Sequence, residues 1–132
     1  MSEEDPLEGL YIDKKEIDRS RLTEVLLKFV GIDKETGDPH LRKPFYSLSA
    51  KEKVICFLLY RKAKMLLGRV SEENEGLSSK EISNLTGVKY NTVRGINSRV
   101  DLIVKKKVKG GFIIPSVNII PAMNLLSEEK DE

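Results

Sequence analysis

The first forty residues contain one stretch with the apolar periodicity of a helix. Asp13 and Glu16 have the spacing of a helix-capping pair, and Ser20 is a second possible start. The apolar positions that follow are three or four residues apart and predict a helix that ends near Gly31: Leu22, Val25, Leu26, Phe29 and Val30. The segment 33–39, DKETGDP, is rich in turn-forming residues and predicts a loop.

Two capping boxes mark the starts of helices in the second half of the chain. Ser49 with Glu52 predicts a helix over 50–67 that Gly68 stops. Ser78 with Glu81 predicts a second, short helix that ends at Gly87. The acidic segment 71–76 between these helices is expected to be a solvated connection. Cys56 is the single cysteine and lies in an apolar run, so we expect it in the core.

The stretch 77–99, LSSKEISNLTGVKYNTVRGINSR, has the pattern of two helices joined by a tight turn. Gly87 supplies the left-handed turn residue, and Ser83, four residues earlier, is small enough to let the helices cross closely. The expected inward residues are Ile82, Leu85, Val88, Val93, Ile96 and Val100. The opposite face of the second helix carries polar groups able to bond base edges or phosphates: Tyr90, Asn91, Arg94, Asn97 and Ser98.

The segment 103–115 predicts two short strands joined at Gly110 and Gly111. Four lysines lie within five residues of the first strand and the turn: Lys105, Lys106, Lys107 and Lys109. Such a hairpin is suited to lie along a phosphate backbone. The alternative is an edge strand that its lysines protect from aggregation.

Taken together, these elements resemble the winged helix-turn-helix superfamily of DNA-binding proteins, and KEISNLTGVKYNTV in particular is similar to its transcription regulators. The resemblance covers about half of the chain. It implies a mainly α fold with a small β-hairpin wing, in the α+β class. We expect an N-terminal helical extension and loop over 1–48, the winged domain over 49–116, and a C-terminal segment over 117–132 with a short helix and an acidic tail.

The resemblance also implies how the chain functions: as a transcriptional regulator that binds double-stranded DNA. The helix 90–102 would then enter the major groove, and the hairpin 103–114 would contact phosphates. The residues expected to contact DNA are Ser79, Lys80, Lys89, Tyr90, Asn91, Thr92, Arg94, Ser98, Lys105, Lys107 and Lys109.

Three positions depart from the pattern of the superfamily. Lys89 stands where a serine or threonine cap is common, so the second helix lacks a good N-cap. Gly95 lies inside that helix, where glycine costs roughly 1 kcal/mol relative to alanine. Asn97 occupies a position that is usually leucine. Either the apolar face of the helix is shifted, or Asn97 makes a buried hydrogen bond.

Charge is strongly segregated although the net charge is only +2. Residues 1–40 carry −5, 71–75 carry −3 and 112–132 carry −3, whereas 41–70 carry +7 and 76–111 carry +6. A basic middle is typical of a surface that binds a polyanion. Lys51 or Lys53 is a further candidate for phosphate contact, and the cluster 61–64 is expected on a surface that faces solvent or a partner.

Other functional classes lack the residues that they need. The chain has one histidine, one cysteine, no glycine-rich phosphate loop and no metal-ligand cluster, which argues against an enzyme and against a metal or cofactor site. No membrane span or secretory signal is recognisable, so a cytoplasmic protein is expected. A homodimer through the N-terminal or C-terminal helices is expected by analogy. The alternative function is a winged-helix subunit for protein interaction or non-specific nucleic-acid binding in a larger transcription, replication or RNA-processing assembly.

Overall fold

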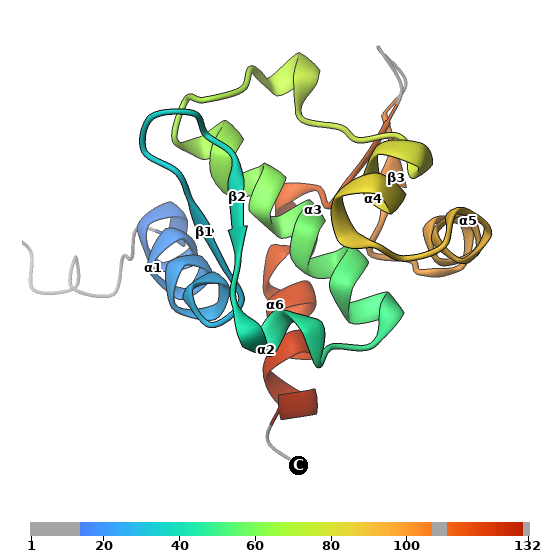
Figure 1. Cartoon of the computed structure of the whole chain (residues 1–132). Helices are drawn as coiled ribbons and strands as arrows, with labels where there is room; N and C mark the ends of the chain where they lie inside the picture. The colour runs from blue at the N-terminus through green and yellow to red at the C-terminus, as the bar shows by residue number, and fades with distance from the viewer. Residues whose placement is uncertain (1–13, 107–110, 131–132) are drawn as a thin grey trace, which may run out of the picture.

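The computed structural model describes residues 14–106 and 111–130, which form a mainly helical α+β fold with two small antiparallel hairpins (Figure 1). In chain order the elements are α1 (Lys14–Leu27), β1 (Val30–Ile32), β2 (Pro39–Leu41), α2 (Lys43–Tyr46), α3 (Ala50–Leu66), the 3-10 turn η2 (Glu72–Asn74), α4 (Ser79–Thr86), α5 (Tyr90–Arg99), β3 (Val104–Lys105), β4 (Phe112–Ile113), the 3-10 turn η3 (Ser116–Asn118) and α6 (Ile119–Lys130).

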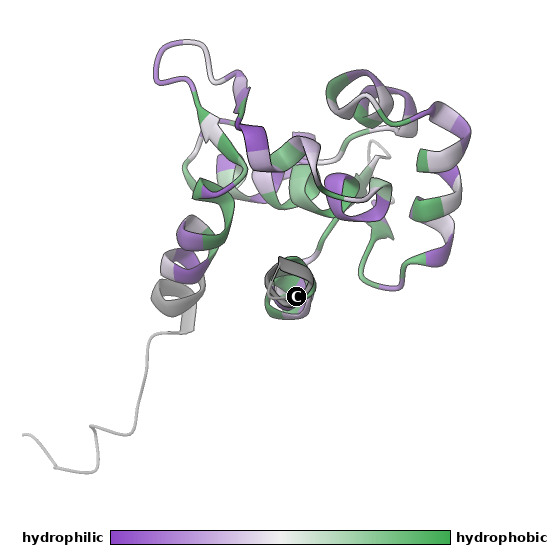
Figure 2. Ribbon diagram, turned by 60° about the horizontal axis from the view of Figure 1, so that its bottom comes forward, coloured by the Kyte–Doolittle hydropathy of each residue, from purple (hydrophilic) through white to green (hydrophobic). Residues whose placement is uncertain are grey.

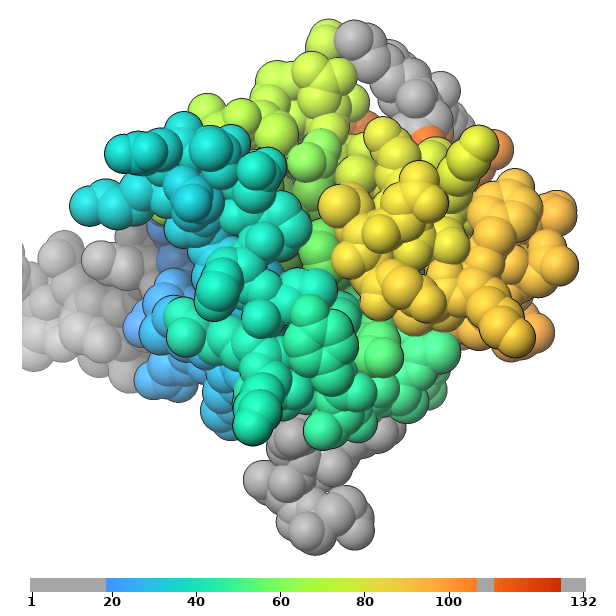
Figure 3. All heavy atoms as spheres, in the orientation of Figure 1, coloured from blue at the N-terminus to red at the C-terminus, as the bar shows by residue number. Residues whose placement is uncertain are grey.

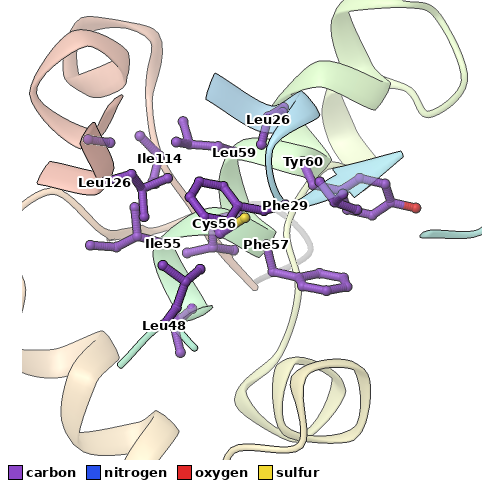
Figure 4. Close-up of a cluster of buried hydrophobic side chains, with 14 of the residues drawn as sticks. Leu26, Phe29, Leu48, Ile55, Cys56, Phe57, Leu59, Tyr60, Ile114 and Leu126 are labelled. Atoms are coloured by element: carbon purple, nitrogen blue, oxygen red, sulfur yellow. The ribbon is translucent and has the colours of Figure 1, made fainter. Parts of the chain in front are cut away.

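Helix α3 is the central element, and the other helices pack around it. It begins as predicted, because the Ser49 hydroxyl accepts from the Glu52 amide at 3.2 Å while the Glu52 carboxylate accepts from the Ser49 amide at 2.8 Å. Seven consecutive residues, 54–60, are buried, so this helix is covered on nearly all sides. The Cys56 side chain is fully buried as expected, and burial raises the pKa of its thiol to about 12 (Figure 4).

The N-terminal region differs from the prediction. Helix α1 ends at Leu27 and not near Gly31, and Val30 opens strand β1 instead of closing the helix. Val30 pairs with Leu41, so the predicted loop is the turn of a β-hairpin, in which the Asp33 carboxylate accepts from two backbone amides. The amide of Phe29 bonds to Leu26 and its carbonyl accepts from Arg42, which closes the helix and fixes the hairpin beside it.

The C-terminal helix is longer than expected. Helix α6 starts at Ile119 rather than Ala122, and Pro121 lies within its first turn, where proline removes no helical hydrogen bond. It packs between α1 and α3, and its inner residues are buried within the chain: Ile119, Ala122, Met123 and Leu126. Much of the apolar surface that the sequence offers for dimerisation at this end is therefore covered by the chain's own core.

The acidic connection before α4 is not simply solvated. The Glu75 carboxylate is 1% exposed and contacts the Lys62 ammonium, 4% exposed, at 3.1 Å. Arg61 donates to the carbonyls of Asn74 and Glu75 at 2.7 and 3.2 Å. The prediction that the basic cluster 61–64 faces solvent or a partner is therefore wrong for Lys62, which holds the connection onto α3.

No helix within the described parts of the chain combines the length and apolarity that crossing a bilayer requires.

Candidate functional site

Helices α4 and α5 are joined by the tight turn that the sequence predicts. The Ser78 hydroxyl accepts from the Glu81 amide at 3.1 Å, and the Glu81 carboxylate accepts from the Ser78 amide, which starts α4. Gly87 ends the helix with φ 82°, in the left-handed region. The Ser83 hydroxyl donates to the Val88 carbonyl at 2.6 Å and so ties the helix to the turn.

The prediction that Leu85 of α4 faces inward is wrong. Leu85 is 40% exposed, whereas Ile82 and Thr86 are buried. The Thr86 hydroxyl donates to the Ile82 carbonyl at 2.7 Å and accepts from the Val88 amide, so its polar atom is satisfied without solvent. Threonine therefore occupies the inward position that the sequence pattern assigns to leucine.

Helix α5 is shorter than the predicted span of 90–102. It ends at Arg99, and Val100 has an extended backbone as its C-cap. The expectation of a weak start is confirmed, because Lys89 makes no side-chain cap hydrogen bond. Val93 and Ile96 face the core, and the helix packs against α3 and α4.

Asn97 makes the buried hydrogen bond that was one of two alternatives for this position. Its side chain is 5% exposed, and its amide nitrogen donates to the Ser79 hydroxyl oxygen at 3.0 Å. The contact joins the last turn of α5 to the first residue of α4. Because Ser79 uses a lone pair of its oxygen here, its hydroxyl hydrogen stays available to an acceptor in the adjoining groove.

The outward face of α5 is polar and exposed. Figure 2 shows hydrophilic and hydrophobic residues alternating along this helix at the right edge of the molecule. The exposed side chains are Tyr90, Asn91, Thr92, Arg94, Ser98 and Arg99. The Tyr90 ring is 48% exposed, and the Arg94 guanidinium carbon lies 5.7 Å from its centroid.

Hairpin β3–β4 lies beside this face. Val104 pairs with Ile113 and Lys105 with Phe112, and Phe112 also forms a two-bond bridge to Leu77, just before α4. Gly111, with φ 82°, packs so closely that an added Cβ would lie 2.9 Å from the Gly76 carbonyl carbon. The hairpin and the start of α4 are thus one unit.

The lysines of the hairpin differ in their surroundings. The Lys105 side chain is exposed, whereas Lys106 is half-buried and donates to the carbonyl of Glu72 in η2. Lys107 and Lys109, both predicted to contact DNA, lie outside the described residues.

A groove of about 830 Å³ brings α4, α5 and the hairpin together. Seven of the predicted residues line it: Ser79, Lys80, Tyr90, Asn91, Arg94, Ser98 and Lys105. Lys89, the N-cap of α5, and Thr92 on α5 are exposed but do not line the groove. Four further lining residues were not predicted as contacts: Ser78, Gly95, Gly111 and Phe112. A Cβ at either glycine would meet close neighbours, the Arg99 guanidinium at Gly95 and the Gly76 backbone at Gly111. A glycine inside a helix and one in a hairpin were the available signals.

The groove offers hydrogen-bond donors and positive charge. Lys80, Arg94 and Lys105 are its cations, and Ser79 and Asn91 add neutral donors. The Ser98 hydroxyl donates to the Gly95 carbonyl at 3.1 Å, so its oxygen faces the groove as an acceptor. None of its lining residues is acidic. Such a surface suits a polyanion that also carries hydrogen-bond acceptors.

Comparisons of the chain with protein-family models, with curated proteins and with solved structures gave no match.

Proposed function

We propose that this protein binds double-stranded DNA as a winged helix-turn-helix transcriptional regulator. In this proposal α4, the Gly87 turn and α5 are the helix-turn-helix, and the hairpin β3–β4 is the wing. Helix α5 enters the major groove, while α4 and the wing rest on the sugar-phosphate backbone.

The observation that carries the proposal is the groove between α4, α5 and the hairpin. Three elements that are separate in the sequence direct cations and neutral donors into one concave surface without a lining carboxylate. A surface for protein docking would be expected to expose apolar side chains there. Among the residues that line the groove, the large apolar side chains are Tyr90 and Phe112, beside three cations.

The contacts divide into two groups by their chemistry. Tyr90, Asn91, Arg94 and Ser98 project from α5 and are assigned to the major groove, where arginine and asparagine match guanine and adenine edges. Ser79 and Lys80 of α4 and Lys105 of the hairpin are assigned to phosphates, together with the predicted contacts of Lys107 and Lys109. The Asn97 hydrogen bond to Ser79 holds the two groups in register.

The phosphate assignment predicts a specific change in salt dependence. Lys105→Ala is expected to weaken binding to every duplex alike and to make the slope of log K against log salt less negative by about one. The measurement is fluorescence anisotropy with a labelled mixed-sequence duplex over a series of salt concentrations.

The matched control is Lys34→Ala, which removes the same charge from the exposed turn between β1 and β2. It should leave the slope at the wild-type value. If both variants change the slope equally, or neither does, then Lys105 makes no phosphate contact and the wing has been assigned wrongly.

A further inference from the structure

A second basic surface lies outside the groove, on α2 and the first turns of α3. Lys43 and Lys51 are exposed, Lys53 is half-buried, and the Tyr46 ring between them in sequence is 62% exposed. We call these four residues the α2–α3 patch. Three of them lie at or beside helix N-termini, and none contributes to the groove between α4, α5 and the hairpin.

Aromatic contacts join the two helices of the patch into one surface. The Lys53 ammonium lies 5.9 Å from the centroid of the buried Phe45 ring. That ring meets Tyr46 edge-on, with the centroids 5.6 Å apart. The lysine of α3 therefore lies over a ring of α2, and the same ring contacts the exposed tyrosine.

The positive charge of the patch has little local compensation. Glu52 is the single acidic residue in the segment 39–53, and it is 5% exposed and occupied in capping α3. The same segment carries Arg42, Lys43, Lys51 and Lys53. A surface of this kind attracts an extended anion more than an isolated small one, because its charges are spread over two helices.

Part of the patch lies on α3, the helix against which α5 packs. Helix α3 packs against α5, and in Figure 3 the green-teal atoms of the first turns of α3 lie beside the amber atoms of α5. Duplex DNA carries one negative charge per about 1.7 Å of its axis, so a duplex that extends past α5 brings many phosphates to this side.

We propose that the α2–α3 patch binds the sugar-phosphate backbone of the same duplex, beyond the base pairs covered by α5 and the wing. This inference rests on the proposed function and deepens it. The surface of the protein that contacts DNA then includes residues outside 49–116, so the N-terminal extension takes part in binding. Tyr46 supplies a hydroxyl for a phosphate oxygen next to Lys43.

The test compares two charge reversals on two lengths of duplex. Lys51→Glu places an acidic residue in the first turn of α3, where the helix dipole favours it, so folding should not suffer. Lys34→Glu makes the same charge change in the β1–β2 turn. Each protein is titrated with mixed-sequence duplexes of about 12 and about 36 bp, roughly one and three helical turns.

The expected result is a loss that depends on duplex length. On the long duplex Lys51→Glu should raise Kd by about fivefold or more over wild type, and on the short duplex by less than about twofold, because a phosphate contact is lost only where DNA reaches the patch. Adding Lys43→Glu should enlarge the loss on the long duplex alone. Lys34→Glu should stay near wild type on both.

Other results would overturn the proposal in distinguishable ways. Equal Kd ratios for Lys51→Glu on the two lengths, or ratios matching those of Lys34→Glu, would show that no phosphate reaches the patch, which would then serve another partner. In that case Lys105→Ala would still reduce the salt slope and the proposed function would stand. If wild type binds neither duplex, both proposals fail together.

Discussion

Glu75→Ala is expected to destabilise the fold by about 3–5 kcal/mol, because it leaves the Lys62 ammonium buried without its anion. The two side chains are 1% and 4% exposed and lie 3.1 Å apart. Removal of the carboxylate also frees the connection before α4 from one of its anchors, which include the Arg61 guanidinium and the Lys106 ammonium. Urea denaturation of both proteins measures the difference.

Two further variants separate the buried pair from a general effect of charge. Glu72→Ala removes the same charge from an exposed position and should change stability by less than about 0.5 kcal/mol. The double substitution Lys62→Met with Glu75→Leu should recover most of the loss, since apolar residues of similar volume can replace a buried ion pair. A loss for Glu75→Ala no larger than that for Glu72→Ala would contradict the burial of this pair.

Gly111→Ala is expected to be the more damaging of two substitutions at glycines with positive φ. Gly111 has φ 82°, and an added Cβ would lie 2.9 Å from the Gly76 carbonyl carbon and 3.0 Å from the Leu77 nitrogen, both backbone atoms. Gly68 has φ 81°, yet a Cβ there meets nothing within 4 Å. Both variants carry the strain of a left-handed residue, roughly 1–2 kcal/mol. Only Gly111→Ala adds overlap, typically 1–3 kcal/mol more.

We expect Gly111→Ala to impair DNA binding more than Gly68→Ala does, the same order as for stability. Because the overlap pushes β4 away from the start of α4, Gly111→Ala should also weaken binding to a mixed-sequence duplex and flatten the salt slope. Gly68→Ala, at the end of α3, should leave binding unchanged in the folded protein. Denaturation midpoints and anisotropy titrations of both variants check this. Equal losses of stability at the two glycines would mean that the hairpin does not pack against Gly76 as described.

Local chemistry made the second half of the chain predictable. The capping boxes at Ser49 and Ser78 were placed at the correct residues, because a cap is decided within one turn of helix. Gly87 was likewise assigned correctly to the left-handed turn. Lys89, Tyr90 and Arg94 were expected to be exposed, and they are. A helix that packs on the core with one face leaves the residues of its opposite face in solvent.

What the sequence did not disclose depends on contacts between distant segments. Lys62 lies three residues after Leu59 and so continues the buried stripe of α3, but its partner is thirteen residues away. Glu75 is two residues before the buried Leu77, the spacing of one face of an extended segment. The spacing at each position indicates burial. Burial of either charged side chain is favourable only because the opposite charge lies beside it.

The hairpin β1–β2 was missed for a related reason. Its strands are three residues each, and Val30 continues the helical spacing of α1, so periodicity alone favoured a longer helix. The groove was incompletely predicted because its shape depends on how closely Gly111 approaches Gly76, which no local pattern encodes.

The central claim is that the polar face of α5 contacts base pairs of duplex DNA, and selection of bound sequences from a random duplex pool at about 150 mM salt, where non-specific attraction is weakened, tests it most directly. Wild type should enrich a defined motif, palindromic if two copies bind together. Arg94→Ala should lose preference at one base-pair position, worth about 1–3 kcal/mol of discrimination. A wild-type pool without any enriched motif, or an identical motif recovered with Arg94→Ala, would contradict the account.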